Sequence, residues 1–191
     1  KMLQKHIRRK EGEKVENITR EDVIQHAQDR EYLLKVASDK ETAPFIEFAT
    51  EELRDDKQLI LTAVNSNGNA LEFASNRLKA DKEIVLAAVQ NAGWVACYAS
   101  EALRDDKEVM LAAVKKEGQA LYYASEKLRD DRQIVVEAVK NKGLIYKYAS
   151  KRLRADIELA VEAIKSDRRA YSYVVEEIKQ NEKIKEILGN D

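Results

Sequence analysis

The chain has 191 residues, of which 36% are charged and 44% hydrophobic, and its formal net charge is −1. Without a basic excess the chain lacks the field that draws proteins to a phosphate backbone, so nucleic acid is not an expected partner. One cysteine excludes an internal disulfide and a cysteine-based metal site, and no apolar run approaches the ~20 residues that span a bilayer.

Residues 1–28 are predicted to form a charged lead and a capping helix. Residues 1–18 are highly charged, and Thr19 followed by Asp22 predicts a capped helix that runs through Ala27. Because the chain starts at Lys1 with no apolar leader, we expect a cytoplasmic protein, and a signal removed upstream stays open.

Residues 29–180 consist of six units of 25 residues, of which the first, 29–53, is degenerate. One column of the units carries Leu53, Leu78, Leu103, Leu128, Leu153 and Ile178, and another carries Phe48, Phe73, Tyr98, Tyr123, Tyr148 and Tyr173. A fixed period of this length indicates an array in which each unit buries its apolar face against its neighbours. The predicted fold is an all-α solenoid of 25-residue helix-turn-helix repeats that wind into a right-handed superhelix.

The first helix of each unit begins at a pair of aspartates. In the fourth unit Asp105 is expected to cap the helix, with Glu108 as its capping-box partner. Where Ala80 or Ala155 replaces the first aspartate, the second must serve. The apolar band that follows, Val109–Val114, is too wide for a helix with one wet side. It predicts a helix packed between neighbours on both flanks.

A glycine follows the first helix in four units, at Gly68, Gly93, Gly118 and Gly143. A left-handed residue just past a helix end favours glycine, and we expect that conformation here. The second helix should run from about Gln119 to Leu128, with Ala120, Leu121, Tyr123, Ala124 and Leu128 buried. In the first unit Pro44 falls in the first turn of this helix. Each unit is therefore predicted to hold two helices of roughly ten residues, each marginal by itself.

Residues 181–191 are predicted to be a C-terminal capping half-repeat. Asn181 to Leu188 resembles a first helix in which Lys185 and Glu186 replace apolar columns, which gives the polar outer face of a cap. With both ends of the array covered, we expect a monomer.

Recurring motifs carry a family resemblance. The stretch YASEALRDDKEVMLAAVKKEGQALYYASEKLRDD contains D-K-E-x-V-x-x-A-V, A-L-x-x-A-S and L-R-D-D elements. With these the chain resembles the bacterial and protist repeat family catalogued as domain of unknown function 4116, best over residues 54–155. The sixth unit departs, since Arg168 stands at the glycine position and Val174-Val175 replaces Ala-Ser. The resemblance implies an α-helical repeat module, often within larger proteins, and no catalytic residues.

Patterns that could suggest catalysis or metal binding each have a structural alternative. His6 and His26 stand in no metal-binding motif, and the single glycines form no phosphate loop. The paired aspartates recur at helix starts, so capping accounts for them better than calcium binding or acid–base work. A serine column, Ser75, Ser100, Ser125 and Ser150, has no nearby base, and close helix packing is the better account. We expect no cofactor and no metal.

Two further columns could hold a ligand. A basic residue opens each unit, at Arg54, Lys79, Arg104, Arg129 and Arg154. These residues could bind a polyanion, but the aspartates beside them favour local ion pairing. The aromatic column could be a stacking platform, but its spacing from the alanine and leucine columns favours a core position with hydroxyls at the edge.

One face of the second helix varies between units, at positions spaced i, i+3 and i+7. In the middle of the array it carries Trp94 and Cys97, Gln119 and Tyr122, and Leu144 and Lys147, with Glu101, Glu126 and Lys151 at the last position. Clustered exposed aromatics mark interaction sites, and the alternative is that Trp94 and Leu144 cover the loop. We predict a non-enzymatic module that binds a protein or peptide partner on this face. A structural spacer within a larger protein is the alternative, and part of an enzyme is less favoured.

Overall fold

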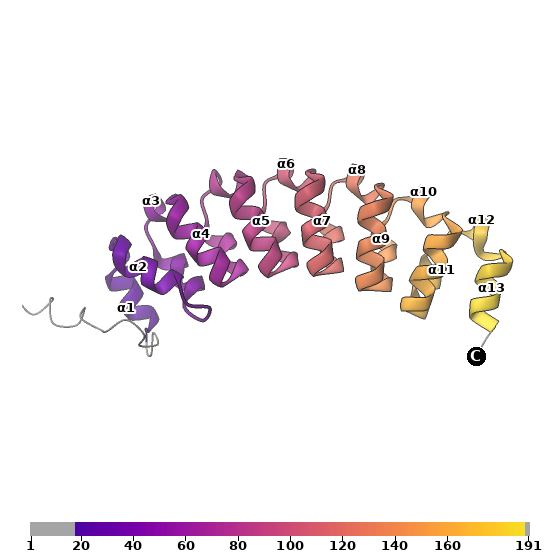
Figure 1. The fold of residues 1–191 in the computed structure, drawn as a ribbon, viewed down its shortest axis with the longest axis horizontal. Helices are drawn as coiled ribbons and strands as arrows, with labels where there is room; N and C mark the ends of the chain where they lie inside the picture. Colours follow the sequence, from indigo (N-terminus) through magenta and orange to yellow (C-terminus); the bar gives the residue numbers. More distant parts are fainter. Residues whose placement is uncertain (1–17, 190–191) are drawn as a thin grey trace, which may run out of the picture.

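The structure, a computed structural model, describes residues 18–189 of the chain. The helices stack into an elongated, gently curved row with α1 at one end and α13 at the other (Figure 1). Successive long helices pack on one another, and no strand occurs in residues 18–189. The predicted all-α solenoid is confirmed, and the right-handed sense of its superhelix stays a prediction.

In the structure a repeat is best counted from the aspartate that caps its long helix, which from the second unit onward is two residues later than the sequence units, and each repeat then contains three helical segments. The first is a long α-helix: α2 (Arg30–Ala37), α4 (Lys57–Ser66), α5 (Lys82–Asn91), α7 (Lys107–Lys116), α9 (Arg132–Asn141) and α11 (Ile157–Ser166). The second is a 3₁₀-helix: η2 (Ala43–Phe48), η3 (Gly68–Phe73), η5 (Gly93–Tyr98), η6 (Gly118–Tyr123), η7 (Gly143–Tyr148) and η8 (Arg168–Tyr173). The third is a single turn: α3 (Glu51–Arg54), η4 (Leu78–Ala80), α6 (Glu101–Arg104), α8 (Glu126–Arg129), α10 (Lys151–Arg154) and α12 (Glu176–Lys179). The single turns lie along the outer edge of the arc (Figure 1).

The predicted continuous second helix, Gln119 to Leu128, is wrong. It divides into η6 and α8 because Ala124 and Ser125 are extended, with ψ of 152° and 160°. The Ser125 amide donates to the carbonyl of Arg104 in the preceding repeat at 3.2 Å. Its hydroxyl accepts from the Leu128 amide, so the serine column caps helices rather than permitting close packing. The predicted burial of the alanines and leucines holds, and Tyr123 is half-buried.

The glycines after the long helices are required by packing, and the predicted left-handed conformation is wrong. None of them has a positive φ in the left-handed region. Gly118 begins η6, and a Cβ placed on it would lie 2.5 Å from the carbonyl oxygen of Ala138 in the next repeat. A Cβ on Gly93 would lie 2.4 Å from the Ala113 carbonyl oxygen. Only a residue without a side chain lets the four 3₁₀-helices that begin with these glycines approach the following long helix this closely.

The second aspartate of each pair caps the long helix, so the expected capping box of Asp105 with Glu108 is wrong. Asp106 accepts from the Glu108 and Val109 amides at 2.9 and 3.1 Å. Asp105 instead accepts from the hydroxyl of Ser125 in the next repeat at 2.6 Å. The two aspartates therefore have separate roles, one within its helix and one between repeats.

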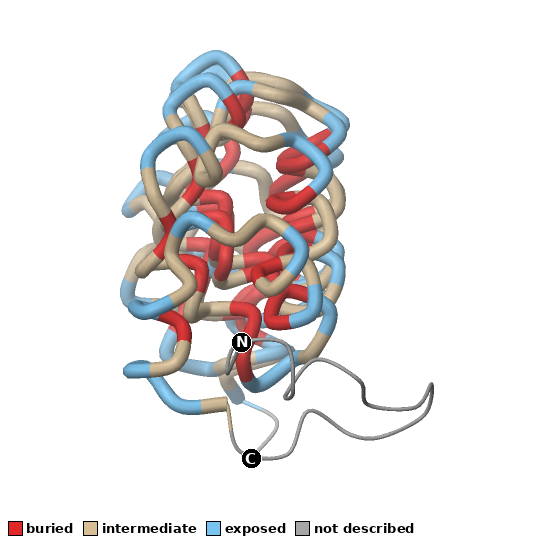
Figure 2. The backbone as a smooth tube through the Cα atoms, turned by 90° about the vertical axis from the view of Figure 1, so that its left-hand side faces the viewer, coloured by how far each residue is buried: buried red, intermediate tan, exposed pale blue. Residues whose placement is uncertain are grey.

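The hydrophobic core runs through the whole stack between the row of long helices and the row of 3₁₀-helices (Figure 2). On α7 the wide apolar band buries Val109, Met110, Ala113 and Val114, as a helix with neighbours on both flanks requires. Each fully buried valine or methionine side chain stabilises the fold by about 1.5–3 kcal/mol.

The first and last helices of the described array are α1 (Arg20–Gln25) and α13 (Glu182–Gly189). The predicted Thr19–Asp22 capping box is present, although α1 ends at Gln25, before Ala27. Pro44 lies in the first turn of η2, as predicted. α13 packs on α11, buries Ile184 and leaves Lys185 and Glu186 exposed. The predicted lead, residues 1–17 with His6, lies outside the described residues.

Candidate interaction surface

The six predicted contact residues lie on three consecutive 3₁₀-helices and form what we call the interaction face: Trp94 and Cys97 on η5, Gln119 and Tyr122 on η6, and Leu144 and Lys147 on η7. A 3₁₀-helix has three residues per turn, so side chains at i and i+3 lie directly above one another. η5 packs on η6 and η6 on η7, which places the three pairs side by side.

The third predicted column does not belong to the same helical surface. Glu101, Glu126 and Lys151 begin the single turns α6, α8 and α10, beyond the extended break. An i+7 residue shares a face only when the helix continues, and here it does not.

Tyr122 is the prominent group of the interaction face. Its side chain is 54% exposed, and among the large hydrophobic residues described only Ile24 is equally open. Gln119 is also exposed, whereas Trp94, Leu144 and Cys97 are half-buried. Trp94 packs against the core and meets Tyr98 edge-on at 5.7 Å, so part of its ring is already covered within the chain. Burial raises the pKa of the Cys97 thiol, so this cysteine is less ionised than an exposed one.

The aromatic column runs beside these residues and is half-buried in every repeat, as predicted. Tyr122 joins the column, because its ring meets Tyr123 at 5.1 Å and Tyr148 of the next repeat at 5.0 Å, both edge-on. Burial, with Glu72 as the second cause, raises the pKa of Tyr98 to about 12. The Tyr98 hydroxyl therefore stays protonated at neutral pH and can donate a hydrogen bond.

The basic column lies along the same surface, and the expected local ion pairing is wrong. The Lys79 ammonium lies 6.0 Å from the centre of the Tyr98 ring, and Arg154 Nη1 donates to the Tyr173 carbonyl at 3.4 Å. Buried Nε atoms without a hydrogen-bond partner in the described chain occur in Arg54, Arg104, Arg129 and Arg154. Sequence proximity suggested aspartate partners, so these arginines were not predicted as part of the interaction face.

The neighbouring aspartates are already paired with other cations. The capping aspartate binds the lysine or arginine that begins the long helix of the preceding repeat, as in Lys57–Asp81, Lys82–Asp106 and Lys107–Asp131 at 2.8, 2.8 and 2.6 Å. The first aspartate binds a cation of the following repeat, as in Asp55–Arg77, Asp105–Lys127 and Asp130–Arg152 at 3.0, 3.4 and 3.0 Å.

At one junction between repeats both members of such an ion pair are replaced by alanine. Where Ala80 replaces the first aspartate, the position that would hold its cation in the next repeat is Ala102. The aspartates therefore hold repeats together, which favours the structural interpretation over calcium binding. Residues 18–189 contain no group of three or more histidine, cysteine or acidic side chains placed to hold a metal ion.

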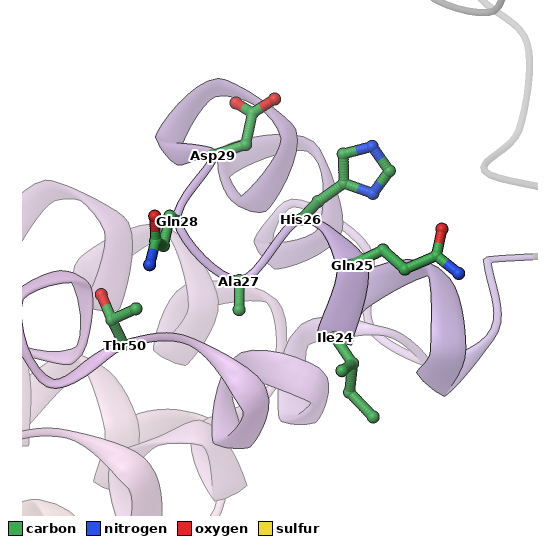
Figure 3. Close-up of a pocket in the computed structure, with 7 residues that line it drawn as sticks. All are labelled: Ile24, Gln25, His26, Ala27, Gln28, Asp29 and Thr50. Atoms are coloured by element: carbon green, nitrogen blue, oxygen red, sulfur yellow. The ribbon is translucent and has the colours of Figure 1, made fainter. Parts of the chain in front are cut away.

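A hollow lies at the N-terminal turn, lined by residues 24–29 and Thr50. Figure 3 shows that the side chains of Gln25, His26 and Asp29 point away from one another, while Gln28 faces Thr50. The His26 ring stacks on Tyr32 at 4.3 Å, and its Nδ1 lies 2.7 Å from the Asp22 carbonyl oxygen. The polar groups do not converge as a catalytic site requires, and His26 is engaged locally.

The family described as Domain of unknown function (DUF4116) matches residues 29–79, 56–104, 81–129, 106–154 and 131–179. The chain belongs to this family. No curated protein and no solved structure matches it. The five overlapping matches of the DUF4116 domain advance in steps that follow the repeat, and the family description assigns no activity.

One further finding concerns membranes. In the described part of this DUF4116 array, no helix has the length and apolar character needed to cross a bilayer.

Proposed function

We propose that the chain is a non-enzymatic interaction module that binds a protein or peptide segment along the interaction face. The observation that carries this proposal is Tyr122, an open aromatic group in the middle of the array that is in contact with the aromatic column. Clusters of this kind are the usual anchors of protein interfaces. Solenoids offer extended surfaces with few convergent polar groups, which suits binding better than catalysis.

The electrostatics of the array also favour binding over catalysis. The pKa values of Asp55, Asp105 and Asp130 are lowered chiefly because each carboxylate accepts a hydrogen bond from a serine hydroxyl. The pKa values of Asp81 and Asp106 are lowered chiefly by the hydrogen bond from the lysine that begins the long helix of the preceding repeat. These shifts arise from contacts that join repeats, not from a cleft prepared for proton transfer.

A structural spacer is the competing function, and the regular ion pairs between repeats favour it. The test is affinity capture from the source cells with wild type, Trp94→Ala/Tyr122→Ala and a control, Ile24→Ala. Ile24 has the same exposed fraction as Tyr122 but lies on α1, away from the interaction face. We expect partners that are lost with the double variant and kept with the control, while circular dichroism shows all three chains folded. Identical partner sets, or none, support the spacer.

A further inference from the structure

The basic column follows the interaction face along the array. Arg104, Arg129 and Arg154 end the single turns α6, α8 and α10, next to the 3₁₀-helix of the following repeat. Arg154 Nη1 reaches the last carbonyl of η8, and the carbonyls of Arg104 and Arg129 accept hydrogen bonds from the Ser125 and Ser150 amides, just after η6 and η7. The single turns that carry these arginines therefore border the row of 3₁₀-helices that forms the interaction face.

These three arginines have no acidic partner among residues 18–189. The ion pairs between repeats use other cations, at the starts of the long helices and within the single turns. Within the described part of the chain, the side chains of Arg104 and Arg129 make no hydrogen bond, and all three arginines have a buried Nε without an acceptor. A guanidinium with its inner nitrogen buried has lost part of its hydration, so an anion at its outer nitrogens is bound more strongly than in open water.

Charge along the surface changes from the N-terminal to the C-terminal half. The column that contains Tyr122 reads Glu47, Glu72, Cys97, Tyr122, Lys147 and Ser172 in successive repeats. Its carboxylates lie in the first two repeats, and Lys147 stands over the rings of Tyr148 and Tyr173 at 4.8 and 5.9 Å. From η5 onward this column carries no carboxylate and combines Tyr122 with Lys147, which is complementary to an acidic segment with apolar residues.

The geometry of the array sets the spacing that such a segment needs. Packed helices lie about 8–10 Å apart, and a peptide extended in the polyproline II conformation advances about 3.1 Å per residue with three residues per turn. One repeat therefore corresponds to roughly three residues of the peptide, and every third side chain lies on the same side. A planar guanidinium binds a carboxylate through two parallel hydrogen bonds, which rewards correct spacing.

We propose that the interaction face binds an extended acidic peptide segment, and that Arg104, Arg129 and Arg154 bind carboxylates at every third residue of it. This inference rests on the proposed function, since it names the class of partner that the same surface takes. Tyr122, between the arginines, contacts an apolar residue of the segment.

Binding can be measured directly because Trp94 is the single tryptophan of the chain and lies on the interaction face. Synthetic peptides of about twelve residues are titrated while Trp94 emission is followed, with anisotropy of a fluorescein-labelled peptide as the second readout. One peptide carries three aspartates at third-residue spacing around a leucine. Its isomer has the aspartates adjacent, and two further peptides replace them with asparagine or lysine. We expect the spaced peptide to bind at least about tenfold more tightly than each of the others.

Variants of the chain then test the arginines. Arg129→Gln should weaken the spaced peptide at least about tenfold, and Arg129→Lys should restore part of the affinity because it keeps charge without the paired geometry. Lys116→Gln is the matched control, since Lys116 is an exposed cation in the last turn of α7. It should leave the affinity unchanged, and circular dichroism should show all variants folded.

The outcomes separate the two proposals. Equal binding of the asparagine or lysine peptide, no binding of any peptide, or indifference to Arg129→Gln overturns the acidic-segment inference. If the asparagine peptide binds as well as the spaced peptide and is lost in Trp94→Ala/Tyr122→Ala, the proposed function stands and only the acidic class falls. If the spaced peptide depends on Arg129 but not on Tyr122, the proposed face is wrong. A single-stranded oligonucleotide that competes equally well shows general polyanion binding and overturns the peptide inference.

Discussion

Replacement of Gly118 by alanine tests why a glycine follows each long helix. The new Cβ would lie 2.5 Å from the Ala138 carbonyl oxygen and 3.2 Å from the Asn141 Cβ, so η6 must move away from α9. Overpacking of this kind costs about 1–3 kcal/mol, and the lower backbone entropy of alanine in the unfolded chain offsets about 0.4–1 kcal/mol. We expect Gly118→Ala to lower the free energy of unfolding by about 1–2 kcal/mol.

The assay is urea unfolding followed by circular dichroism, with thermal unfolding beside it. At about 2–4 °C per kcal/mol, the melting temperature should fall by roughly 2–8 °C. Gly189→Ala is the matched control, because a Cβ at Gly189 has no atom within 4 Å. Gly118→Asn separates the two explanations: asparagine tolerates a left-handed backbone but is larger than alanine. If it is more stable than Gly118→Ala, or if Gly118→Ala equals wild type, the packing explanation is refuted.

Two further predictions concern a helix cap and the end of the array. Asp106→Asn should keep most of the N-cap, whereas Asp106→Ala should cost about 1 kcal/mol at pH 7. The hydrogen bond from Lys82 holds the Asp106 pKa below its usual range, so the carboxylate contributes stability above pH ~4 and loses it as the pH falls through the folded-state pKa. The difference in urea midpoint between wild type and Asp106→Asn should therefore shrink from pH 7 to pH 3, and a constant difference contradicts this assignment. Deletion of residues 178–191 removes α13 from α11 and should expose Ala160, Ile164 and Tyr171, which costs a few kcal/mol at ~25 cal/mol per Å² and causes self-association. Light scattering after size-exclusion chromatography measures this, with the full chain expected to be a monomer; a monomeric deletion variant with an unchanged melting temperature shows that α13 is not a cap.

Family membership and repeat architecture follow from local spacing in the sequence. The apolar columns recur at a fixed interval, and the wide band of α7 indicates a helix with neighbours on both flanks, because burial is proportional to apolar area wherever the partner lies. The i, i+3 spacing of Gln119 and Tyr122 placed them on one face, since this relation holds in α- and 3₁₀-helices alike.

The sixth repeat lacks the glycine that follows the long helix in the four repeats before it. Arg168 occupies the glycine position and is exposed. The 3₁₀-helices η3, η5, η6 and η7 pack on the long helix of the next repeat, whereas η8 packs less extensively on α13 and reaches it through the Arg168 guanidinium, which donates to the Leu188 carbonyl. The sequence shows that glycine is lost here, but only the stack shows that the close approach requiring it is also lost.

What the tertiary structure decided is the set of partners that meet between repeats. The Ser125 amide donates a hydrogen bond to the Arg104 carbonyl, which divides the second helix in two. Asp105 accepts from the Ser125 hydroxyl and pairs with Lys127 rather than with the adjacent arginine. These partners are 20 to 22 residues apart in the sequence and become neighbours only when one repeat is stacked on another. Local propensity determines which segments can be helical. The backbone groups and charges of the neighbouring repeat determine where a helix ends and which arginines are left without a partner, because hydrogen bonds and ion pairs depend on distance in space rather than along the chain.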